Sequence, residues 1–190
     1  MTGLWNIPNC ITLARICLVV ALYPLVWLGP REWILPMFVI TSLTDTLDGY
    51  LARRLKQTSY IGMRLDSFAD YFLFGSTAIW AYWLAPAMFR ENRAAWLVMA
   101  ATLMIPQIIA LVKFGRNAGF HLYSTKAASW SGFFLFVHLL ISGHYSRALL
   151  ALFVIAVIVK SAEETWICLR VADPYADLRP SVLSYWGRLE

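Results

Sequence analysis

The chain has 190 residues, of which 60% are hydrophobic and 14% are charged, and its mean hydropathy is +0.62. This balance excludes an ordinary soluble domain, in which roughly half of the residues are apolar and about a quarter are charged. The formal net charge of +5 does not indicate a nucleic-acid partner, because basic residues of membrane proteins usually set topology and contact anionic lipid. Apolar runs of about 20 residues, enough to cross a bilayer, recur and predict a polytopic membrane protein.

The first predicted helix covers residues 8–28. We expect it to stay in the mature protein, because no basic residue precedes Arg15 and no small-residue cleavage site follows the apolar run. The second and third helices, 33–55 and 60–85, are joined by a short basic turn, so we expect antiparallel neighbours. Three more helices are predicted at 94–114, 126–142 and 147–170.

The predicted fold is therefore an all-α membrane protein, a bundle of six transmembrane helices within residues 1–171. Residues 172–190 form a polar tail. With both termini on one side, that side carries ten Lys and Arg residues and the opposite side carries four. The positive-inside rule then predicts that both termini are cytoplasmic.

Acidic residues are scarce, eleven in all, yet four of them fall within 26 residues of the second and third helices. Spacings of three and four place each pair on one helix face. Helical periodicity adds two small residues to the first face, where they would let a ligand approach the backbone. The four acids are Asp45, Asp48, Asp66 and Asp70, and the small residues are Gly49 and Ala52.

Four carboxylates converging in a low-dielectric bundle cannot all be ionised without cations. Oxygen ligands favour Mg²⁺ or Mn²⁺ over zinc, and Mg²⁺ is usually shared between carboxylates and substrate phosphates. Two such cations about 3.5–4 Å apart would clamp an in-line displacement at phosphorus, and Arg53 could bind diphosphate oxygens. The alternative is that the acids pair with Arg53, Arg54 and Arg64 at the membrane boundary, which explains one aspartate better than four.

The chain also resembles a known family. Its acids stand in the pattern D-x2-D-G-x2-A-R-x8-G-x3-D-x3-D, which begins at Asp45 and ends at Asp70. This is similar to the signature of the CDP-alcohol phosphotransferase (phosphatidyltransferase) family, and every fixed position is met. The run from Asn6 to Arg15 also resembles the entry to the first helix in this family, although less specifically.

The resemblance implies roles for individual residues. The four aspartates would hold two divalent cations, Mg²⁺ or Mn²⁺, and Asp70 would also act as general base, which the spacing alone does not single out. The residues expected to bind the CDP moiety are Asp48, Gly49, Ala52, Arg53, Gly62 and Asn9.

The resemblance further implies transfer of a phosphatidyl group from CDP-diacylglycerol to a small alcohol, with release of CMP, in phospholipid biosynthesis. The favoured acceptor is glycerol 3-phosphate, as in phosphatidylglycerophosphate synthase-like members; inositol, inositol phosphate and serine stay open. We expect a cytoplasmic active site in a bacterial inner membrane, lipid contacts and a homodimer. Rival classes are a cation transporter that uses the aspartates as a transit site and a non-catalytic scaffold.

Four basic residues are candidates for binding a phosphorylated acceptor. Lys113, Arg116 and Lys126 lie around the predicted cytoplasmic loop between the fourth and fifth helices, and Lys160 lies within an apolar helix. The alternatives are a positive-inside loop without a ligand and a pairing of Lys160 with Glu163 or Glu164.

Overall fold

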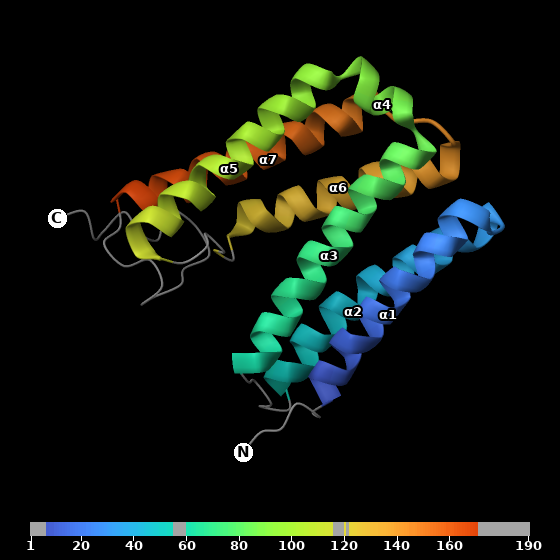
Figure 1. The fold of residues 1–190 in the computed structure, drawn as a ribbon, viewed down its shortest axis with the longest axis horizontal. Helices are drawn as coiled ribbons and strands as arrows, with labels where there is room; N and C mark the ends of the chain where they lie inside the picture. Colours follow the sequence, from blue (N-terminus) through green and yellow to red (C-terminus); the bar gives the residue numbers. More distant parts are fainter. Residues whose placement is uncertain (1–6, 55–59, 116–119, 121, 171–190) are drawn as a thin grey trace. The chain divides into compact units, whose positions relative to one another are not determined.

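The structure is a computed structural model that describes residues 7–54, 60–115, 120 and 122–170; within its helices the side chains of 8, 45–54, 60, 61, 63, 64 and 67 are outside the description. All regular elements in these residues are helical (Figure 1). The chain divides into two compact units, residues 1–84 and 85–190, which are taken separately below.

The first unit contains α1 (Ile7–Leu28), the short 3₁₀ helix η1 (Arg31–Trp33), α2 (Ile34–Arg54) and α3 (Tyr60–Leu84). Helix α1 packs against both α2 and α3. Its buried residues recur every three or four positions and so form one face. That face is polar near the start of the helix and apolar further on: Asn9, Thr12, Arg15, Val19 and Leu22.

Helices α1 and α3 run parallel, because later residues of α1 contact later residues of α3. Arg15 meets Asp66 and Asp70, the Tyr23 hydroxyl donates to Ser76 Oγ at 2.9 Å, and the Trp27 and Trp83 rings stack with centroids 5.2 Å apart. Helix α2 returns alongside α1 after the turn at η1. The first unit therefore has a polar end, where α1 and α3 begin and α2 finishes, and an aromatic end.

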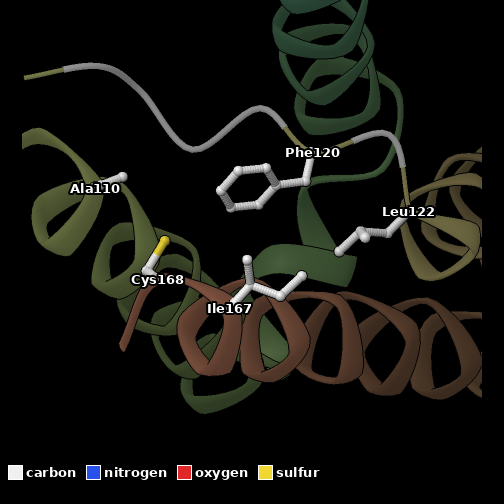
Figure 2. Packing of buried hydrophobic residues seen from close by; sticks show 5 residues of the cluster. All are labelled: Ala110, Phe120, Leu122, Ile167 and Cys168. Carbon is white, nitrogen blue, oxygen red and sulfur yellow. The ribbon is translucent and has the colours of Figure 1, made fainter. Parts of the chain in front are cut away.

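The second unit contains α4 (Pro86–Glu91), α5 (Arg93–Phe114), α6 (Tyr123–Ser142) and α7 (Arg147–Arg170). Helix α7 packs against both α5 and α6. Figure 2 shows an apolar cluster between α5, α7 and the residues just before α6, formed by Ala110, Phe120, Leu122, Ile167 and Cys168. Helices α5 and α6 are each followed by a glycine, Gly115 and Gly143, whose φ angles of 64° and 74° suit glycine because it has no Cβ.

The helical prediction is confirmed for the described residues, with small differences at helix ends. The fifth predicted helix begins at Tyr123 instead of 126, since the Lys126 amide already donates to the carbonyl of Leu122. Lys126 therefore lies in the first turn of α6. The sequence did not predict η1 or α4, which are only three and six residues long. The polar tail, 172–190, lies outside the described residues.

Among the residues that the structure describes, two helices are long and apolar enough to cross a membrane. They cover Asn9–Leu28 and Arg93–Phe114, each with a mean hydropathy of 2.1, and only 22% and 17% of their apolar windows are buried. A core helix of a soluble protein would be mostly buried. These helices therefore indicate a membrane protein, whereas the number of spans and the side on which the termini lie stay predictions.

Candidate active site

The polar end of the first unit is organised around Arg15. Its Nη1 donates to Oδ1 of Asp70 at 2.7 Å, and its Nη2 lies 3.3 Å from Oδ1 of Asp66. The Arg15 side chain is fully buried, whereas those of Asp66 and Asp70 are 43% and 50% exposed. The two carboxylates therefore lie between the packed helices and a more open surface.

This arrangement follows from helix geometry. Asp66 and Asp70 are four residues apart, so their side chains leave α3 on the same face. A guanidinium presents several N–H donors in a planar fork, which lets one arginine bind two carboxylates at once. The buried positive charge needs such partners, because an unpaired charge in a low-dielectric interior is strongly unfavourable.

Other polar residues share this end of the molecule. Asn9 and Thr12 are each 3% exposed and lie on the same face of α1 as Arg15. Gly62 is half-buried in the first turn of α3. One end of the first unit thus contains four residues that the sequence predicted to bind substrate or cation: Asn9 of α1 and Gly62, Asp66 and Asp70 of α3.

The remaining motif residues lie in the last part of α2. The backbone of Asp45, Asp48, Gly49, Ala52 and Arg53 is helical, and their side chains lie outside the described residues. Among the side chains that the structure describes, no group of three or more His, Cys, Asp or Glu gathers as a metal site. The described pair Asp66 and Asp70 offers carboxylate oxygens, which are the ligands that a hard cation such as Mg²⁺ prefers.

The predicted acceptor residues belong to the second unit, where three are described. Lys113 donates to the carbonyls of Cys168 and Leu169 at 2.9 and 3.2 Å, so it caps the last turn of α7. Lys160 is paired with Glu164 at 2.9 Å, and Glu164 is only 1% exposed. The Lys126 ammonium lies 5.8 Å from the centroid of the Tyr123 ring. Arg116 lies outside the described residues.

Sequence reasoning did not predict the partners of Arg15. The pairing joins residues 51 and 55 positions apart, which no helical spacing relates. A signal was nevertheless present, since Arg15 follows Asn9 and Thr12 at intervals of three on an otherwise apolar helix. A polar stripe of this kind on a membrane helix favours a functional face.

The fold and this site define a helical protein with apolar helices that indicate a membrane protein and with two carboxylates of α3 paired to a buried arginine of α1. Residues 5–172 match the CDP-alcohol phosphatidyltransferase family. The chain therefore belongs to the CDP-alcohol phosphatidyltransferase family.

Curated relatives carry the name CDP-diacylglycerol–glycerol-3-phosphate 3-phosphatidyltransferase. The protein of Pseudomonas fluorescens is 32% identical over 110 residues, which are 56% of this chain and 52% of the relative. The protein of Pectobacterium atrosepticum is 35% identical and that of Salmonella typhimurium 33% identical, each over 67% of this chain and 69% of the relative. The match thus spans about half of the first relative and about two thirds of the others. No solved structure is significantly similar to the chain.

Proposed function

We propose that this protein transfers the phosphatidyl group of CDP-diacylglycerol to a hydroxyl of glycerol 3-phosphate. The acceptor oxygen forms a bond to the lipid-linked phosphorus, the bond from that phosphorus to the CMP oxygen breaks, and CMP leaves. The observation that carries the proposal is the complete family motif, whose last two acids meet at Arg15. The printed names of the curated relatives support the choice of donor and acceptor.

Asp45, Asp48, Asp66 and Asp70 are proposed to hold two divalent cations, Mg²⁺ or Mn²⁺. The buried residues Ile34, Phe38 and Thr41 of α2 follow one another at intervals of four and three residues. Positions 45 and 48 continue this helical repeat. This register supports a location of the first acid pair on the face of α2 that packs in the unit. Bound cations would neutralise the diphosphate and stabilise the leaving CMP.

The residues of the chain supply the remaining chemistry. Asp70 is proposed to take the proton from the acceptor hydroxyl, as the family resemblance implies, and its half-exposed side chain is open to an acceptor. The CDP moiety would contact Asp48, Gly49, Ala52, Arg53, Gly62 and Asn9. Arg53 would bind phosphate oxygens through its planar fork of donors.

The phosphate of the acceptor requires cations, and the candidates are Lys113, Arg116, Lys126 and Lys160. The structure gives two of them other partners: Lys113 caps α7, and Lys160 pairs with Glu164. Lys126 is exposed in the first turn of α6, where a helix N-terminus favours an anion. We therefore propose Lys126 as the first described residue to test for acceptor binding.

The proposed enzyme is a multi-pass protein of a bacterial inner membrane, with its active site and both termini in the cytoplasm, and it forms a homodimer. Large apolar side chains are exposed on helices beyond the two strongest spans, including Ile40 of α2, Phe74 of α3 and Ile141 of α6. Exposure of this kind recurs along helices of both units. It supports further contact with lipid.

The choice of acceptor is tested with purified protein, CDP-diacylglycerol, Mn²⁺ and a panel of glycerol 3-phosphate, inositol, inositol phosphate and serine. Mass spectrometry identifies the lipid product and chromatography measures CMP. We expect phosphatidylglycerol phosphate and an equal amount of CMP with glycerol 3-phosphate alone. Turnover with inositol or serine but not with glycerol 3-phosphate would refute the proposed acceptor while leaving the reaction class intact.

A further inference from the structure

Arg15 is completely buried and, among the side chains that the structure describes, contacts the acids Asp66 and Asp70. Its side chain has no exposed surface, and it contacts Asp70 through Nη1 and Asp66 through Nη2. Both contacts use the Oδ1 oxygen of the carboxylate. A carboxylate has a second oxygen that can ligate a cation, so contact with Arg15 and cation binding are chemically compatible.

The fork of donors fixes the direction of both acids. An aspartate side chain has several rotamers of similar energy, and two carboxylates on one helix face repel each other. A guanidinium that binds one oxygen of each lowers that repulsion and selects one rotamer for each side chain. Ligands that are already oriented bind a cation more tightly, which is the role that outer partners have around protein metal sites.

A purely structural role explains Arg15 less well. Helices α1 and α3 are also joined by the hydrogen bond from Tyr23 to Ser76 and by the stacked rings of Trp27 and Trp83, and Val19 and Leu22 are fully buried in α1. These contacts hold the helices together without a buried charge. A charge within a membrane helix is costly and favours a functional explanation.

We propose that Arg15 is a positioning residue that orients Asp66 and Asp70 as cation ligands before substrate binds. The inference rests on the proposed function, because it assigns cations to these acids. It extends the site from the motif in α2 and α3 to α1. Arg15 acts through the two carboxylates, not by contact with the reacting atoms.

The test is Mn²⁺ binding to the purified full-length protein without substrate, measured by isothermal titration calorimetry. Arg15→Lys keeps the charge but presents a single ammonium in place of the fork, and Arg15→Gln keeps N–H donors without the charge. We expect the Kd for Mn²⁺ to rise by about 10–100-fold in both variants. Tyr23→Phe is the matched control, since it removes a different polar contact between α1 and α3, and its Kd should equal that of the wild type.

A wild-type Kd in either Arg15 variant would overturn the inference. Failure of both variants to fold would also overturn it, because Arg15 would then be a structural residue. CMP release by the wild type is measured on the same preparation. Wild-type protein that binds Mn²⁺ but releases no CMP counts against the proposed function, whereas the comparison of Mn²⁺ affinities still decides the role of Arg15.

Discussion

At the scale of single residues, the first unit is defined by the half-exposed carboxylates of Asp66 and Asp70 beside the fully buried guanidinium of Arg15. The Arg15 side is closed by packed helices, so the proposed function requires that substrate approach from the side of Asp66 and Asp70. The spacing of these two acids predicted that they share a helix face, and the structure agrees. Their shared arginine could not be predicted, because it depends on how α1 packs against α3.

Asp70→Asn removes the proposed base and one negative charge while keeping the size of the side chain. We expect CMP release to fall by at least about 100-fold, the lower range for loss of a general base. Glu91→Gln is a suitable control, since Glu91 is an exposed acid of the second unit that pairs with Arg147, and it should keep wild-type turnover. More than half of the wild-type turnover in Asp70→Asn would rule out Asp70 as the base.

Lys160→Met leaves Glu164 buried without its partner. Breaking a buried ion pair from one side typically costs about 3–5 kcal/mol, so we expect a large loss of stability in a denaturant titration in detergent. The double variant Lys160→Met/Glu164→Leu replaces the pair by apolar groups and should recover most of that loss. If Lys160→Met instead keeps full stability and raises the KM for glycerol 3-phosphate, Lys160 binds the acceptor.

At the scale of helices, small residues decide how closely elements approach. A Cβ at Gly132 of α6 would lie 2.9 Å from a ring carbon of Phe153 in α7, whereas a Cβ at Gly75 of α3 would meet nothing within 4 Å. Small residues at such contacts are typical of membrane helices. The periodicity of the sequence predicted these helices but could not tell which glycine faces a neighbour.

Gly132→Val should therefore destabilise the packing of α6 on α7 by about 1–3 kcal/mol, the usual effect of overpacking. Gly75→Val introduces the same residue into a helix where space is open, and it should change stability much less. Thermal unfolding of both variants in the same detergent measures the difference. Equal melting temperatures for the two variants would show that Gly132 is not a close contact.

At the scale of the whole molecule, the sequence was most informative where a pattern is long. Apolar windows of some 20 residues predicted the long helices, and the repeated acid spacing predicted the candidate site. The shorter α4, with six residues, carries too little periodicity to be recognised. The resemblance to the family came from fixed gaps between chemically distinctive residues of Asp45–Asp70, and the match over residues 5–172 confirms it.

Topology provides a prediction for the chain as a whole. A fluorescent protein fused to the C-terminus should fluoresce, because such reporters fold in the cytoplasm. Alkaline phosphatase inserted at Gly143, between α6 and α7, should be active, because that turn is predicted on the opposite side. The reverse pattern would contradict the positive-inside assignment and the cytoplasmic active site.

The central claim is that clustered aspartates hold divalent cations for transfer of a phosphatidyl group. CMP release from CDP-diacylglycerol by the purified protein, measured before chelation, after chelation and after Mn²⁺ is restored, tests it most directly. We predict release only with glycerol 3-phosphate and cation together, loss of release on chelation and full recovery with Mn²⁺. Release that chelation leaves unchanged, or cation movement across vesicles without any CMP, would contradict the claim.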